Sequence, residues 1–162
     1  MKAVVLIGHG GVPKDFPSLK VGRLRTLEAQ RQINNAVISD EEARLDHEIR
    51  TWPRSKENDP FHFGILSIAK HLQEKIGGTK LVIAYNEFCG PSIEEATYQL
   101  VLEGYNHVVF LTTMFTPGGV HSEFEIPVIV DSLKKQYPTV QFEYPWPFNM
   151  DQVATFLSAQ LS

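Results

Sequence analysis

The chain has 162 residues, of which 43% are hydrophobic and 21% are charged, a composition that builds a core and excludes an intrinsically disordered protein. Its net charge of −4 argues against a nucleic-acid-binding protein, and no apolar run approaches the roughly 18 residues that span a bilayer. The single cysteine, Cys89, excludes an internal disulfide. We therefore expect one cytoplasmic domain over residues 1–162, with neither nucleic acid nor membrane as partner.

Four short segments are expected to form a sheet. Residues 3–7, 81–85 and 108–112 are almost continuously apolar, which is typical of parallel strands covered on both faces. Residues 140–144 alternate between polar and apolar side chains, which indicates an edge strand or a strand with one face in water.

Helical patterns alternate with these strands. Apolar residues recur at helical spacing in 65–76, 91–104, 124–133 and 150–161. The first pattern stops at two glycines, and the second begins with Pro91 and acidic residues. The alternation predicts right-handed βαβ units and a three-layer α/β fold, with a mostly parallel four-stranded sheet flanked by helices.

A polar insertion separates the first two strands, at about residues 11–60. Its segments 24–33 and 41–49 are expected to be helical, because a structureless loop of this length is uncommon in a compact domain. The first half of the insertion is basic, through Lys14, Lys20, Arg23, Arg25 and Arg31. The second half is acidic. The insertion is either a solvated helical hairpin or a lid whose basic residues meet an anionic ligand.

Chemically capable side chains follow three of the strands. His9 follows the first strand, Glu87 the second and His121 the third. Because ligands bind at the carboxyl ends of parallel strands, these residues are expected to converge. Two imidazoles and a carboxylate suit a borderline divalent metal such as Co²⁺, Fe²⁺, Ni²⁺ or Zn²⁺. Glycines beside both histidines leave space for a bulky planar ligand.

Structural roles are the alternatives for these residues. Each histidine could be structural, and Glu87 could cap the helix that begins near Pro91. Residues 8–11 could cradle a phosphate, although they match neither the P-loop nor the dinucleotide-binding motif. Nothing in the sequence marks Cys89 as a thiolate. The aromatic and proline residues of 52–54 and 144–148 either pack the ends of the core or form a wall beside a flat macrocycle.

Three segments resemble the CbiX-type sirohydrochlorin chelatases, the small class II chelatases of the cobalamin and sirohaem pathways. They are Val5-Leu-Ile-Gly-His-Gly10, Ala84-Tyr-Asn-Glu-Phe-Cys-Gly-Pro-Ser-Ile-Glu-Glu-Ala96 and Thr116-Pro-Gly-Gly-Val-His-Ser-Glu-Phe-Glu-Ile-Pro127. The resemblance covers residues 1–10 and about 62–161. The chain departs from the family at Gly11, where serine is usual, and in the length of the insertion.

The resemblance implies a chelatase-like fold and an ATP-independent lyase that inserts Co²⁺ or Fe²⁺, or alternatively Ni²⁺, into sirohydrochlorin. It implies that His9 and His121 are the catalytic, proton-accepting and metal-binding pair, and that Glu87 is a third metal ligand. No cofactor beyond the metal substrate is expected. Because short relatives pair to complete a cleft, we also expect a homodimer. The alternative function is a non-catalytic carrier of a metal or a tetrapyrrole.

Overall fold

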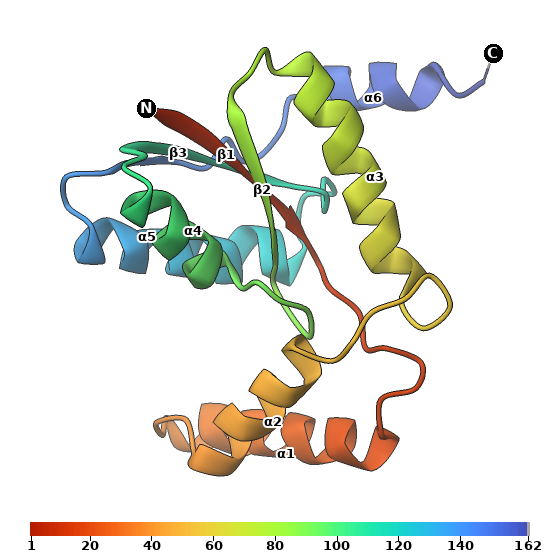
Figure 1. Cartoon of the computed structure of the whole chain (residues 1–162), viewed down its shortest axis with the longest axis vertical. Helices are drawn as coiled ribbons and strands as arrows, with labels where there is room; N and C mark the ends of the chain where they lie inside the picture. The colour runs from red at the N-terminus through yellow and green to blue at the C-terminus, as the bar shows by residue number, and fades with distance from the viewer. Residues whose placement is uncertain (162) are drawn as a thin grey trace.

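A parallel sheet with strand order β2–β1–β3–β4 lies at the centre of the computed structural model, which describes residues 1–161 (Figure 1). The strands are β1 (Lys2–Gly8), β2 (Lys80–Tyr85), β3 (His107–Thr112) and β4 (Gln141–Glu143). Val5 of β1 lies opposite Val82 on one side and Phe110 on the other, and all three ladders are parallel. The predicted sheet is confirmed, with β4 as its short edge strand.

Helices cover both faces of this sheet. α3 (Pro60–Lys75) packs on one face, and α4 (Ile93–Leu102) and α5 (Ile126–Gln136) pack on the other (Figure 1). Successive side chains of β1 alternate between the two layers, so that Val5 is buried with α4 and α5 and Leu6 is buried with α3. This double burial explains the continuous apolar pattern, and the predicted three-layer α/β fold is confirmed.

The start of α4 differs from the prediction. The hydroxyl of Ser92 accepts a hydrogen bond from the Glu95 amide, and the Glu95 carboxylate accepts one from the Ser92 amide. This capping box makes Ser92 the N-cap, so the helix begins at Ile93 instead of Pro91. Glu87, which the sequence offered as an alternative cap, therefore does not serve that purpose.

The helix that follows β3 begins earlier than its apolar pattern. A π-helical turn, His121–Glu125, leads directly into α5, and the amide of Ile126 donates to the carbonyl of His121. Pro127 has no N–H group, so the normal helical bond to the Glu123 carbonyl cannot form, which favours the wider turn. The turn places His121 at the carboxyl edge of the sheet.

The insertion forms a helical hairpin of α1 (Ser18–Asn34) and α2 (Asp40–Arg50), both longer than predicted, at the carboxyl ends of β1 and β2 (Figure 1). Its own hydrophobic core includes Phe88 from the loop after β2, packed with Phe16, Leu24, Leu45 and Ile49. The two ends of the insertion meet, because the Lys14 amide donates to the Asn58 carbonyl at 2.9 Å.

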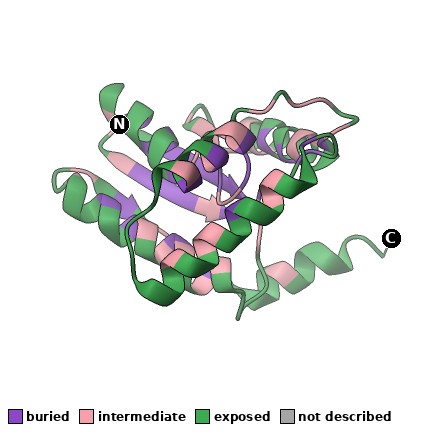
Figure 2. Ribbon diagram, turned by 90° about the horizontal axis from the view of Figure 1, so that it is seen from below, coloured by how far each residue is buried: buried purple, intermediate pink, exposed green. Residues whose placement is uncertain are grey.

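The last helix, α6 (Met150–Ser158), extends away from the remaining structure (Figures 1 and 2). It buries none of its residues, and Leu161 beyond it is 90% exposed. With so little burial, packing contributes little to the last turn of the predicted 150–161 pattern, and the helix is shorter than predicted. Among residues 1–161, no helix combines the length and apolar character required to cross a bilayer.

Candidate functional site

The loops after β1 and β2 are joined by an extension of their ladder. The Asn86 amide donates to the Gly8 carbonyl at 3.0 Å, and the Glu87 amide donates to the His9 carbonyl at 2.8 Å. Gly10 has a φ of +91°, and a Cβ atom there would lie 1.8 Å from the Glu87 carbonyl oxygen. Only glycine fits this approach, so it fixes His9 beside Glu87.

His9 and His121 form the centre of the site, with ring centroids 4.6 Å apart and ring planes at 88°. The Nδ1 atom of His9 lies 2.7 Å from the Gly10 carbonyl oxygen, which can only accept a hydrogen bond. The Nδ1 atom of His121 lies 2.7 Å from a carboxylate oxygen of Glu125. The Gly10 carbonyl assigns the proton of His9 to Nδ1, which leaves the Nε2 lone pair of His9 free for a metal or a proton. The Nδ1 atom of His121 faces two groups, the Glu125 carboxylate and the Asn86 side-chain amide nitrogen at 3.0 Å.

Glu125 and Asn86 belong to the same site, although they are not among the residues predicted from the sequence. The Asn86 side-chain amide donates to Glu125 at 2.6 Å. Burial alone would raise the pKa of Glu125, but the hydrogen bonds from His121 and Asn86 hold it below its ordinary value. The spacing of His121 and Glu125, four residues apart at a helix start, was the available signal.

Three of these side chains could hold a cation. One ligand atom each from Glu87, His121 and Glu125 lies within 4.8 Å of the others. His9 was predicted as a ligand together with Glu87 and His121. It lies outside the group of Glu87, His121 and Glu125, but its ring contacts the His121 ring. The site thus brings all three predicted residues together and adds a second carboxylate, a mixed nitrogen and oxygen donor set suited to a divalent transition metal.

The basic residues of the hairpin differ in their partners. Lys20 pairs with Glu48, and Arg23 pairs with Glu41 at 2.5 Å, so both hold α1 against α2. Arg25 instead reaches the site and pairs with Glu87 at 3.0 Å. The hairpin is therefore in direct contact with a candidate metal ligand, which favours the lid interpretation over a purely solvated hairpin.

Two cavities lie on the side of the site formed by the segments after β3 and β4. One, of about 240 Å³, is lined by His9, Met114, Thr116, Gly119, His121 and Ser122. The other, of about 530 Å³, is lined by Phe115, residues 145–149 and side chains of α6. The segment 114–116 borders both cavities, so the aromatic side chains of 144–148 approach the site from the β4 side. Trp52, in contrast, packs edge to face on Phe16 within the hairpin.

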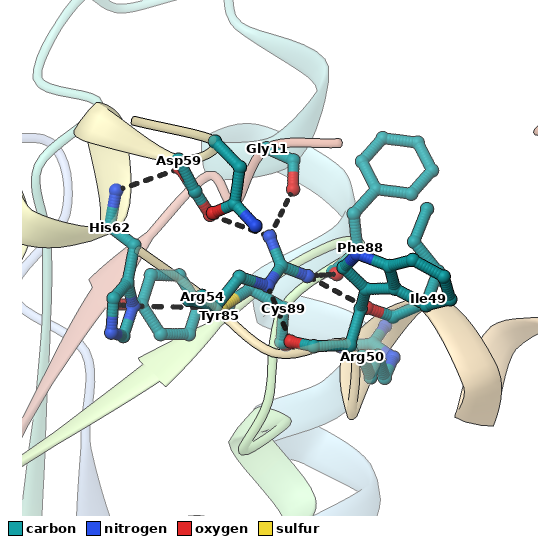
Figure 3. Close-up of polar contacts among 12 residues, drawn as sticks. Gly11, Ile49, Arg50, Arg54, Asp59, His62, Tyr85, Phe88 and Cys89 are labelled. Atoms are coloured by element: carbon teal, nitrogen blue, oxygen red, sulfur yellow. Dashed lines mark hydrogen bonds and ion pairs between the residues drawn. The ribbon is translucent and has the colours of Figure 1, made fainter. Parts of the chain in front are cut away.

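A buried arginine ties the hairpin to both loops of the site (Figure 3). Arg54, with 8% of its side chain exposed, pairs with the buried Asp59 at 2.5 Å. Its guanidinium also donates to the backbone carbonyls of Gly11 and Ile49, at 2.7 Å each, and of Phe88. These bonds connect the loop after β1, the end of α2 and the loop after β2. No sequence pattern around Arg54 indicates this role.

Comparisons with known proteins agree with this architecture. The curated sirohydrochlorin cobaltochelatase of Priestia megaterium is 34% identical over 68 residues, which cover 42% of this chain and 22% of that protein. The sirohydrochlorin chelatase SirB of Bacillus subtilis subspecies spizizenii, solved in complex with cobalt, superposes with a TM-score of 0.51 at 15% identity. That match covers 88% of this chain and 42% of SirB, so this chain spans less than half the length of these two relatives.

A second solved structure is similar in size. The cobalamin (vitamin B12) biosynthesis CbiX protein of Marinobacter aquaeolei VT8 has a TM-score of 0.52 at 14% identity, over 98% of this chain and 91% of that protein. At these identities the structures establish the chelatase fold alone. The model of the CbiX family matches residues 62–160, which is more than half of the sequence. This chain therefore belongs to the CbiX family.

Proposed function

We propose that this protein inserts a divalent metal, Co²⁺ or Fe²⁺ or alternatively Ni²⁺, into sirohydrochlorin, as an ATP-independent lyase of cobalamin or sirohaem biosynthesis. The observation that carries the proposal is the contact of His9 with His121 beside two carboxylates, in a chain of the CbiX family. The cobaltochelatase name of the Priestia relative supports the same reaction.

The donor set suits a metal that is a substrate. Insertion requires a site that binds the ion and then releases it to the ring nitrogens. His121, Glu87 and Glu125 supply one imidazole and two carboxylates, which leave coordination positions open, unlike a closed four-ligand structural site. The contact between the His121 ring and the Glu125 carboxylate, at 2.7 Å, fixes the orientation of the imidazole.

His9 is suited to proton transfer. As the metal enters the macrocycle, two pyrrole N–H protons must leave. The Nδ1 proton of His9 is engaged by the Gly10 carbonyl, so the Nε2 lone pair is available to accept one of them, and the second proton passes to water. His121 and the two carboxylates then hold the metal while His9 acts as the base, and both histidines are catalytic in this proposal.

Spectroscopic turnover tests the proposal. The purified chain is incubated anaerobically with excess sirohydrochlorin and Co²⁺, then with Fe²⁺ or Ni²⁺, and the visible spectrum is followed. Conversion well beyond one equivalent of protein, faster than the spontaneous reaction, is expected. A spectral change that saturates at one equivalent would support the carrier alternative, and the absence of any change would exclude both functions.

The homodimer expected from the sequence stays a prediction. Light scattering coupled to gel filtration measures the mass directly. A mass of twice that of the chain supports a paired cleft, and a monomeric mass under turnover conditions means that one chain completes the site with its own hairpin.

A further inference from the structure

We propose that Arg25 exchanges partners during the reaction: it holds Glu87 while the site is free of metal, and it binds a carboxylate of the tetrapyrrole once Glu87 turns to the metal. This inference rests on the proposed function, because it assigns the hairpin a role in the same site. Its basis is an ion pair between a hairpin residue and a candidate metal ligand.

The ion pair occupies a carboxylate that the metal would use. The Nη2 atom of Arg25 lies 3.0 Å from the Oε2 atom of Glu87, whose side chain is only 19% exposed. Glu87 also belongs to the trio of candidate ligands with His121 and Glu125. A divalent cation bound there repels the nearby guanidinium and competes with it for the same carboxylate. Metal binding must therefore weaken the pair between Arg25 and Glu87.

Arg25 stays beside the site after this exchange. Its guanidinium carbon lies 4.4 Å from the centroid of the Phe88 ring, a cation–π contact that does not depend on Glu87. Phe88 is itself fixed, because its side chain is buried in the hairpin core and its carbonyl accepts a hydrogen bond from Arg54. Its φ of +55° is unusual for a bulky residue, which shows that the surroundings determine this loop conformation.

The released guanidinium can reach an anionic ligand. Half of the Arg25 side chain is exposed, and its other acidic contact is with Glu28 of the same helix at 3.3 Å. The planar guanidinium fork binds carboxylates in a bidentate geometry, and sirohydrochlorin carries many carboxylates on its rim. Arg25 is therefore placed to recognise the macrocycle next to the metal.

Arg23 of the same helix pairs with a residue outside the site, which supplies a matched control. Arg23 lies two residues away on α1 and donates from Nε and Nη2 to Glu41 of α2, at 2.8 and 2.5 Å. Arg23→Gln removes the same charge from the same helix as Arg25→Gln, but it leaves Glu87 untouched. Any difference between the two variants therefore reports the contact with Glu87 and the site.

The test measures two affinities for each variant, with Co²⁺ alone by calorimetry and with metal-free sirohydrochlorin by absorbance titration. Arg25→Gln is expected to bind Co²⁺ tighter, on the order of threefold, because the metal no longer displaces a partly exposed ion pair. It is expected to bind sirohydrochlorin about tenfold more weakly, because a charge-assisted hydrogen bond is lost. Arg25→Lys keeps the charge and should retain the metal affinity of the wild type, with an intermediate loss of tetrapyrrole affinity.

The opposite signs of these two effects exclude a merely structural role, since damage to the fold would weaken both affinities. If Arg25→Gln and Arg23→Gln had the same affinity for Co²⁺ and the same affinity for sirohydrochlorin, the exchange would be overturned. The proposed function would remain intact. A wild-type protein that binds neither Co²⁺ nor sirohydrochlorin would overturn the proposed function, and the exchange with it.

Discussion

The imidazole rings of His9 and His121 meet edge to face, with centroids 4.6 Å apart, although one ring follows β1 and the other opens the π-helical turn after β3. Their Nδ1 atoms face different acceptors, the Gly10 carbonyl and the Glu125 carboxylate. The two rings are therefore chemically unequal despite their contact, and one of them stands beside an anion.

This inequality predicts different phenotypes for the two histidines. His121→Ala is expected to lower Co²⁺ affinity at least tenfold and to abolish insertion, because it removes a ligand. His9→Ala is expected to retain most of the Co²⁺ affinity and to slow insertion about 100-fold or more, because it removes the base. Calorimetry and the turnover assay separate the two effects. His71→Ala, on the exposed side of α3, is the control and should change neither. Equal losses of metal affinity in both variants would contradict this division of roles.

Glu125 should matter as much as the residues that the sequence selected. Glu125→Gln keeps the side-chain size but removes the negative charge from the group that His121 and Asn86 contact, and it replaces one carboxylate oxygen by a donor. We expect Co²⁺ affinity to fall about 10–100-fold. Glu94→Gln, on the outer surface of α4, removes the same charge outside the site and serves as the control. Unchanged affinity in Glu125→Gln would remove this carboxylate from the site.

Gly10 should tolerate no side chain. Gly10→Ala places a Cβ atom against the Glu87 carbonyl at a φ of +91°, so the backbone strain alone should cost about 1–3 kcal/mol of unfolding free energy. Gly22→Ala, in α1 with no atom within 4 Å of the new Cβ, should instead stabilise by about 0.5–1 kcal/mol. Urea unfolding followed by circular dichroism measures both, and a stable Gly10→Ala protein would contradict the observed loop contact.

Arg54 should be among the most sensitive buried positions. Arg54→Met leaves Asp59 buried without its partner, which is expected to cost about 3–5 kcal/mol of unfolding free energy. The combination with Asp59→Asn should recover part of this loss, because the uncompensated charge is then gone. Lys134→Met breaks the exposed pair with Asp131 and should cost at most about 1 kcal/mol. Similar losses at the two sites would contradict a structural role for the buried arginine.

Cys89 should be unreactive in the folded protein. Its side chain is buried, and burial raises the pKa of the thiol, so less thiolate is present at pH 8 than in an exposed cysteine. Iodoacetamide should label the native protein slowly and the guanidinium-unfolded protein rapidly. Because the chain has one cysteine, mass spectrometry gives an unambiguous count. Fast labelling of the native protein would show that the loop after β2 opens.

The sheet could be predicted because helices cover both faces of β1, β2 and β3, so that side chains of both orientations contribute to the apolar layers. His9, Glu87 and His121 could be predicted because parallel topology alone brings the carboxyl ends of these strands to one edge. The partners of the hairpin arginines could not be predicted from the sequence. Arg23 and Arg25 lie two residues apart, and nothing in the sequence distinguishes their partners. Arg23 pairs with Glu41 and Arg25 pairs with Glu87 because of how α1 packs against α2 and the loop after β2.

The meeting of the two insertion ends has a consequence for engineering. Because the Lys14 amide and the Asn58 carbonyl are hydrogen-bonded, β1 and α3 need no span between them, and a linker of a few residues could replace segment 15–57 without moving either. Asp59 would then require neutralisation, since Arg54 leaves with the excised segment. Phe88 would also lose its packing partners in the hairpin core, so a shortened chain would require a smaller or polar side chain at that position as well.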